Sequence, residues 1–251
     1  MHHLAKRSLK GGRRQTQQKE TSHIGSTCQL LIERYRSQAD LFLVLALNLG
    51  HYPRETATKR DLGRSNLSAA KHASPCSTFP YTNSFPAFIY PFISNWKNVI
   101  GDGNCGYRVV ADFVFSDEHQ WPEVRREMLY ELEHSTNLYV NLVGSEERVN
   151  ELIHRINWLV DGPAPYAHWF ETPNSLYIVA NAFNLCVILI AQLGSTTVLP
   201  LYSCSDRSEG TLVIGFLTEE RHFIQLQLND MCLIPPLHAQ WIHHRSEWVS
   251  N

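Results

Sequence analysis

A single thiol in a glycine-bounded turn is the part of this sequence best suited to chemistry. The stretch Asp102-Gly103-Asn104-Cys105-Gly106 comes directly before apolar residues at helical spacing, so we predict that a helix begins at Cys105. At a helix N-terminus, unpaired N–H groups and the positive end of the helix dipole favour a thiolate over a thiol. Gly103 and Gly106 are expected to let a substrate carbonyl approach the main chain closely. The same turn can therefore carry a nucleophile and an oxyanion hole.

A thiol nucleophile needs a base, and the best candidate is His222. Residues 222–228 alternate between apolar and polar side chains, which predicts a strand that begins at this histidine and holds its ring toward a cleft. In papain-type proteases an imidazole takes the proton from the thiol and later protonates the leaving amine. The other interpretation of His222, from the sequence alone, is a histidine satisfied at a sheet edge.

These two segments together resemble the ovarian tumour (OTU) family of cysteine proteases. The stretch 102–106 is followed over a hundred residues later by His222-Phe223, as in that family. The segments Trp121–Arg125 and His168–Phe170 are similar to OTU-like proteins of plants, some of them related to transposable elements. The resemblance covers roughly residues 85–230. It implies a papain-like α/β (α+β) fold with a central sheet flanked by helices, and hydrolysis of isopeptide bonds to ubiquitin or a ubiquitin-like modifier.

The resemblance also implies a role for each residue of the site. Cys105 would be the nucleophile, and His222 the general base and then the general acid. Many OTU proteases carry an acid or amide two residues after this histidine, whereas this chain has Ile224. We therefore assign the orienting or loop-organising role to Asp102. Gln225 is a weaker candidate, because strand alternation places it on the face opposite to His222.

Other polar residues near these motifs have two interpretations each. Gly103 and Asn104 are assigned to the loop that holds the oxyanion, although Asn104 could simply tolerate a left-handed turn. His168 could line the cleft or pack as an interface histidine. His243 and His244 are adjacent and lack helical or hairpin ligand spacing, so we expect no metal site. The expected chemistry needs no metal and no organic cofactor.

Composition excludes several classes of partner. The 251 residues include 22 Lys and Arg against 24 Asp and Glu, so no net field favours nucleic acid. Six cysteines without a CxxC pair indicate a reducing compartment. The start of the chain lacks the apolar segment of a secretory signal, and the apolar run 41–49 is too short to span a bilayer. We expect a cytoplasmic and/or nuclear monomer whose partners are ubiquitin conjugates.

The chain divides into five predicted parts. Residues 1–27 are read as a basic disordered tail, although their Lys and Arg could bind nucleic acid or serve as a nuclear signal. A helix is predicted over 28–50, followed by a linker rich in Pro and Ser over 51–84. The catalytic domain is predicted over 85–232, and a C-terminal tail over 233–251.

Within the catalytic domain the pattern predicts helices first and strands last. Helices are expected to begin at Cys105, Pro122, Ser145 and Thr172-Pro173. Strands are expected over 185–191, 197–202, 211–217 and 222–228, with 203–210 as an exposed loop.

A second function class fits the same sequence. Ile224 and the basic amino terminus would suit a catalytically weak or inactive OTU-like domain of transposon origin that binds ubiquitin or another partner. Only the enzyme would be captured covalently by a ubiquitin carrying a C-terminal electrophile.

Overall fold

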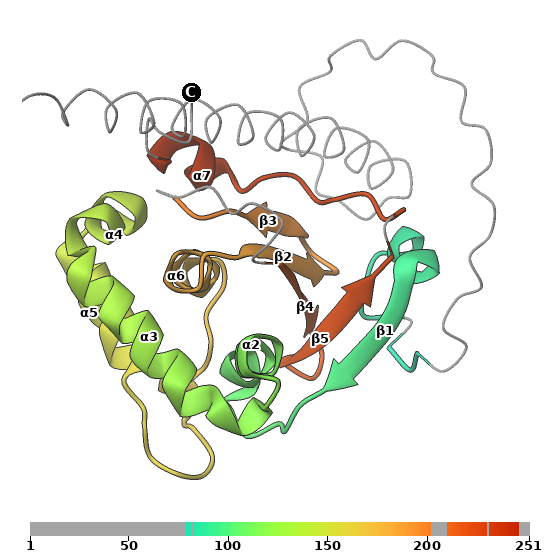
Figure 1. Cartoon of the computed structure of the whole chain (residues 1–251), viewed down its shortest axis with the longest axis horizontal. Helices are drawn as coiled ribbons and strands as arrows, with labels where there is room; N and C mark the ends of the chain where they lie inside the picture. The colour runs from blue at the N-terminus through green and yellow to red at the C-terminus, as the bar shows by residue number, and fades with distance from the viewer. Residues whose placement is uncertain (1–78, 82, 202–209, 230, 246–251) are drawn as a thin grey trace, which may run out of the picture.

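The computed structural model describes residues 79–81, 83–201, 210–229 and 231–245, and Figure 1 draws the remainder as a grey trace. The predicted parts that lie wholly or almost wholly outside the described residues are the tail 1–27, the helix 28–50, the linker 51–84 and the loop 203–210.

A five-stranded sheet in the order β1-β5-β4-β2-β3 is the centre of the fold (Figure 1). Its strands are β1 (Ile93–Asn98), β2 (Cys186–Ala191), β3 (Thr196–Val198), β4 (Thr211–Leu217) and β5 (His222–Leu228). The β2–β4 pair is parallel, and the other pairs are antiparallel. All six residues of β2 are buried, as expected of an apolar strand inside a sheet. The predicted α/β class with a central sheet flanked by helices is confirmed.

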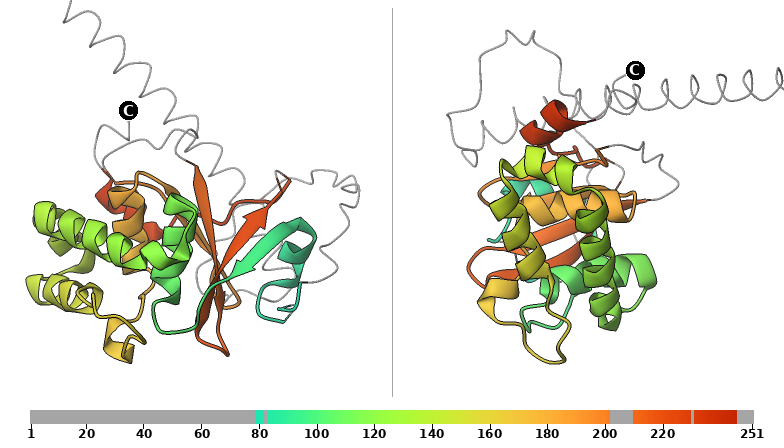
Figure 2. Two further views of the ribbon diagram at one scale, coloured as in Figure 1. Left: turned by 60° about the horizontal axis from the view of Figure 1, so that its bottom comes forward. Right: turned by 90° about the vertical axis from the view of Figure 1, so that its left-hand side faces the viewer.

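Helices cover the sheet unevenly. The α-helices are α2 (Cys105–Phe115), α3 (Trp121–His134), α4 (Thr136–Val143), α5 (Glu146–Ile156), α6 (Asn174–Ala182) and α7 (Ala239–His244), and the 3-10 turns are η2 (Ala87–Phe92), η3 (Glu118–Gln120) and η4 (Tyr166–His168). In the left view of Figure 2, α3 to α6 lie on one side of the sheet, and η2 lies at the far edge, next to strand β1. Helix α2 contacts both β5 and α3, so its first residue lies between the sheet and the helical layer.

Capping and charge explain where α5 begins. The Ser145 hydroxyl accepts a hydrogen bond from the N–H of Arg148, 3.2 Å away, and two glutamates occupy the first turn. Both features stabilise unpaired N–H groups at a helix N-terminus. The predicted start at Ser145 is therefore confirmed. The helix ends at Ile156, and Leu159, three residues further on, is 42% exposed.

The predicted order of helices first and strands last is wrong at β1, which precedes α2. Only Ile93 of this strand is buried, so its sequence lacks the apolar alternation from which strands are recognised. It is an edge strand that pairs antiparallel with β5, with Asn98 opposite Ile224. This pairing brings a segment just before the cysteine turn beside the strand that carries His222.

Residues 233–245 pack on the domain, although the sequence placed the domain boundary at 232. The Trp241 side chain is fully buried, and its Nε1 donates a hydrogen bond to the carbonyl of Pro200, 3.1 Å away. Leu237 forms a bridge with Thr197 of β3. The segment therefore covers the edge of the sheet opposite to β1, where unpaired strand groups would otherwise be exposed.

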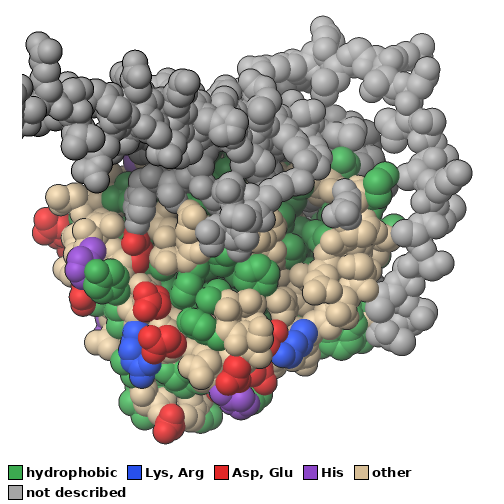
Figure 3. Space-filling view, in the orientation of Figure 1, with side chains coloured by type: hydrophobic (Ala, Val, Ile, Leu, Met, Phe, Trp, Pro, Cys, Tyr) green, Lys and Arg blue, Asp and Glu red, His purple; other side chains and the backbone are tan. Residues whose placement is uncertain are grey.

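The surface mixes charges of both signs. On the face shown in Figure 3, acidic and basic side chains lie close together along the lower edge, below a more hydrophobic centre. The whole chain has a formal net charge of −2. None of the described helices combines the length and apolar character that a membrane crossing requires.

Candidate active site

Cys105 and His222 line one cleft of about 350 Å³. Helix α2 supplies the thiol, and the first residue of β5 supplies the imidazole. The other lining residues are Tyr81, Asn98, Val99, Gly101, Gly103, Trp169, Leu217, Glu220 and Arg221. The two residues that the sequence pairs as nucleophile and base therefore lie at the same concave site.

The Cys105 thiol is nearly buried, with 7% of the residue exposed. Burial raises the pKa of this thiol, and the charge of Asp102 adds to the rise; the N–H groups of Phe223 and Gly106 lower the pKa by less. Desolvation of the thiol therefore opposes the preference for a thiolate that we predicted from the helix N-terminus. A thiol whose pKa is raised depends on a base to become a nucleophile.

The His222 ring is fixed in one orientation. Its Nε2 lies 2.7 Å from the side-chain Oδ1 of Asn98, and because an amide oxygen can only accept, Nε2 donates. In a neutral ring Nδ1 is then the unprotonated nitrogen. Gly101 lies beside Nδ1 of His222. A Cβ added to Gly101 would be 3.6 Å from this nitrogen, which is an ordinary van der Waals contact. Burial lowers the pKa of His222, against smaller raising effects from Glu220 and Asp102, which favours the basic form near neutral pH.

Asn98 is the functional candidate that sequence reasoning missed. It pairs with Ile224, so it is a diagonal neighbour of His222 on the same face of the sheet. The two residues are 124 positions apart in the sequence. Strand β1, which brings Asn98 beside His222, was not predicted. Asn98 thus places an amide oxygen against the imidazole, whereas position 224 offers no polar group.

Position 224 has a different role in this fold. Ile224 is fully buried, and a Cβ on Gly215 would lie 3.0 Å from Ile224 and 2.8 Å from Phe85. A carboxylate at this position would be buried among apolar atoms without a partner. Gln225 lines a separate cavity and does not line the cleft, as strand alternation predicted.

Asp102 organises the turn. Its carboxylate accepts hydrogen bonds from Arg108 Nη2 at 2.6 Å and Arg108 Nε at 3.1 Å, and from the N–H of Asn104 at 3.0 Å. Burial acts to raise the pKa of Asp102, but the bonds from Arg108 and Asn104 outweigh it and hold the pKa below its usual value. Its influence on His222 is that of a nearby negative charge, whereas the hydrogen bond of the ring is donated by Nε2 to Oδ1 of Asn98.

We predict that Asp102→Asn destabilises the protein by about 3 kcal/mol at neutral pH, because Arg108 would remain buried without its counter-charge. The carboxylate's lowered pKa means that its contribution is complete above the unfolded value of 3.8 and is lost as the pH falls through the lower folded value. Urea unfolding of parental and variant proteins should therefore differ most near pH 7 and converge in strong acid.

Glu151→Gln is the matched control for this prediction. Glu151 forms an ion pair with Arg148, but its side chain is 64% exposed, so its loss should cost under about 1 kcal/mol. Equal destabilisation by the two substitutions would show that the pair of Asp102 with Arg108 has no special structural role.

The two glycines of the turn serve packing within the protein. Gly103 has φ +81°, and a Cβ there would overlap the Ala164 carbonyl and the Trp169 ring. A Cβ on Gly106 would overlap Phe170. The segment behind the turn fills the space on the side-chain faces of both glycines, and Gly103 also lines the cleft. The approach of a substrate carbonyl to the main chain at these positions stays a prediction.

The same segment fixes the remaining predicted residues. Asn104 is fully buried, and its amide donates to Asp102 and to the carbonyl of Gly162, so its side chain is directed away from the cleft. Its φ is −98°, so the left-handed residue of the turn is Gly103. His168 is buried against the Trp158 ring, with 4.7 Å between ring centroids, and Trp169 lines the cleft instead.

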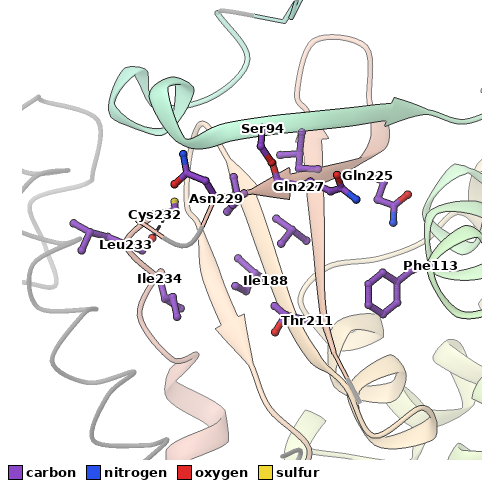
Figure 4. A pocket seen from close by; sticks show the side chains of 13 residues that line it. Ser94, Phe113, Ile188, Thr211, Gln225, Gln227, Asn229, Cys232, Leu233 and Ile234 are labelled. Atoms are coloured by element: carbon purple, nitrogen blue, oxygen red, sulfur yellow. Dashed lines mark hydrogen bonds between the residues drawn. The ribbon is translucent and has the colours of Figure 1, made fainter. Parts of the chain in front are cut away.

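A second, larger cavity of about 600 Å³ contains another thiol, Cys232 (Figure 4). The side chains of Gln225 and Gln227 lie on one side of it, and Leu233 and Ile234 on the other. Burial raises the pKa of Cys232 to about 12, so this thiol is an unsuitable nucleophile. No group of three or more metal-ligating side chains occurs within the described part of the chain.

Comparisons with known proteins give a distant structural likeness. No family model matches the chain, and no curated protein matches it. The OTU domain of OTUD1 is 18% identical with a TM-score of 0.41, over 53% of this chain and 84% of that one. The viral OTU domain proteases from Dera Ghazi Khan virus and Qalyub virus are each 16% identical, with TM-scores of 0.38 and 0.37. They cover 61% and 60% of this chain, and 86% and 89% of their own.

Proposed function

We propose that this protein is an OTU-type cysteine protease that removes ubiquitin or a ubiquitin-like modifier from conjugates. One observation carries the proposal: Cys105 and His222 line one cleft, and Asn98 holds the imidazole so that Nδ1 is left as the base. The resemblance of the stretch 102–106 to the cysteine motif of OTU proteases supports the choice of an isopeptide substrate.

The proposed reaction begins from a neutral pair. Nδ1 of His222 takes the proton of the Cys105 thiol as the sulfur attacks the carbonyl carbon of the scissile amide. The oxyanion is stabilised by backbone N–H groups of the turn, with Cys105 and its neighbours as the donors. The imidazolium then protonates the leaving lysine amine, which leaves a thioester on Cys105. Water, deprotonated by His222, hydrolyses this thioester and restores the thiol.

The test is covalent capture by ubiquitin that carries a C-terminal electrophile, followed by a panel of diubiquitins and ubiquitin-like modifiers. We expect a single adduct with the parental protein, because the electrophile occupies the position of the scissile carbonyl. Cys232→Ala is the matched control, since its thiol lies outside the cleft and its removal should leave capture unchanged.

A purely binding module gives a different result. It would retain the probe reversibly, without an adduct that survives denaturation. Reversible binding with no adduct from any modifier would contradict the proposed activity and favour the binding function.

A further inference from the structure

Arg125 on α3 is a fully buried guanidinium whose described hydrogen bonds all end on neutral oxygens. Burial lowers its pKa, with smaller raising effects from Tyr107 and Asp102. Its Cζ lies 3.6 Å from the centroid of the Tyr107 ring, a distance that favours a cation–π interaction. No carboxylate of the described residues pairs with Arg125, and a buried charge without such a partner is costly unless hydrogen bonds compensate for it.

Arg125 joins three segments that are separate in the sequence. Nη1 donates to the carbonyls of Arg155 and Ile156, at 3.2 and 3.0 Å, which are the last two residues of α5. Carbonyls at a helix C-terminus lack partners within the helix and carry the negative end of its dipole, so they suit a buried cation. Nη2 donates to the carbonyl of His168 at 3.0 Å, in the segment that continues into cleft-lining Trp169.

The remaining bond reaches the cysteine turn directly. Nη2 of Arg125 donates to Oδ1 of Asn104 at 2.7 Å. Because a guanidinium can only donate, this bond requires the amide oxygen to face Arg125 and the amide nitrogen to face the other way. That nitrogen lies 3.3 Å from Oδ2 of Asp102 and 3.4 Å from the carbonyl of Gly162. The orientation of Asn104, next to the nucleophile, is therefore set from α3.

We propose that Arg125 is a positioning residue for the proposed hydrolysis: through Asn104 it holds residues 102–105 in the conformation in which their N–H groups can stabilise the oxyanion. This inference rests on the proposed function, because it concerns the acyl-transfer step. It also explains why a planar donor with several N–H groups occupies this position: a lysine ammonium could not reach acceptors on opposite sides of the group.

The first test is Arg125→Lys, which keeps the charge. We expect kcat for a fluorogenic ubiquitin amide to fall about 100-fold with little change in KM, the size of effect that a small misplacement of catalytic groups produces. Arg126→Lys is the matched control, because Arg126 is the next residue, has a side chain that is 54% exposed and forms an ion pair with Glu123 at the surface. It should hydrolyse at the parental rate.

A second readout separates positioning from general loss of structure. Alkylation of Cys105 by iodoacetamide displaces iodide from a saturated carbon and forms no oxyanion, so its rate should change less than about threefold in Arg125→Lys. Asn104→Ala leaves Arg125 in place and should lower kcat by a similar factor. In the double variant the two losses of kcat should not add, because the proposed effect of Arg125 on the turn passes through its bond to Asn104.

Each result is decisive. The inference is supported if Arg125→Lys loses hydrolysis but keeps its rate of alkylation, and if the losses of kcat in the double variant do not add. Additive losses, parallel loss of hydrolysis and alkylation, or an unchanged kcat in Arg125→Lys would overturn it. Should Arg125→Lys fail to fold, parental hydrolysis by Asn104→Ala would overturn it as well. A parental protein that hydrolyses no modifier removes the proposed function and this inference together, whereas active parental and unaffected variants remove only the inference.

Discussion

Replacement of Cys105 by serine is expected to lower kcat for a fluorogenic ubiquitin amide by at least about 10⁴-fold. In the proposed mechanism the thiol, whose pKa is raised by burial, becomes a nucleophile by proton transfer to His222, and a serine hydroxyl in the same place is far less acidic. His222→Ala should cause a loss of similar size. The double variant should lose little more, because the two residues act as one unit.

Folding of each variant is to be checked by its thermal unfolding. Cys232→Ala serves as a control for loss of a buried thiol elsewhere, and it should keep the parental kcat. If Cys105→Ser retains hydrolysis near the parental rate, the thiol mechanism is wrong, whichever residue then carries the reaction.

The sequence was most informative where a local pattern and a local structure coincide. The glycine-bounded thiol before an apolar helical pattern correctly predicted that α2 begins at Cys105. Alternation over residues 222–228 correctly predicted β5 and its first residue. Both predictions depend on the periodic spacing of apolar side chains, which can be recognised in the sequence alone. The catalytic roles of these residues remain predictions.

The properties that the sequence could not supply depend on contacts between distant segments. The pKa of Cys105 depends on how much water the folded protein removes from the thiol, and burial raises this pKa against the effect expected from the helix terminus. The bonds from Arg125 to Asn104 and to the end of α5 join positions 21 and 31 residues apart. No pattern of neighbouring residues in the sequence indicates either of these contacts.

The orienting residue illustrates the same limit and provides the second strong test. Asn98 was missed because β1 is a mostly exposed edge strand, and its bond to His222 arises only when β1 pairs with β5. We predict that Asn98→Ala lowers kcat by on the order of 10²- to 10³-fold, because the ring loses the acceptor that selects its tautomer and orientation. Asn95→Ala, an exposed asparagine on the same strand, is the control and should have no effect.

Asn98→Asp tests the chemistry of this bond more sharply. A carboxylate beside Nε2 would stabilise the imidazolium and raise the pKa of His222, which burial lowers in the parental protein. Because the basic form of the ring is required, the acid limb of the profile of kcat/KM against pH should move to higher pH in the aspartate variant. A structural role for Asn98 would lower the rate without moving that limb. An unmoved limb, together with a parental rate in Asn98→Ala, would leave the imidazole without an identified orienting group and would require His222 to be held by the sheet alone.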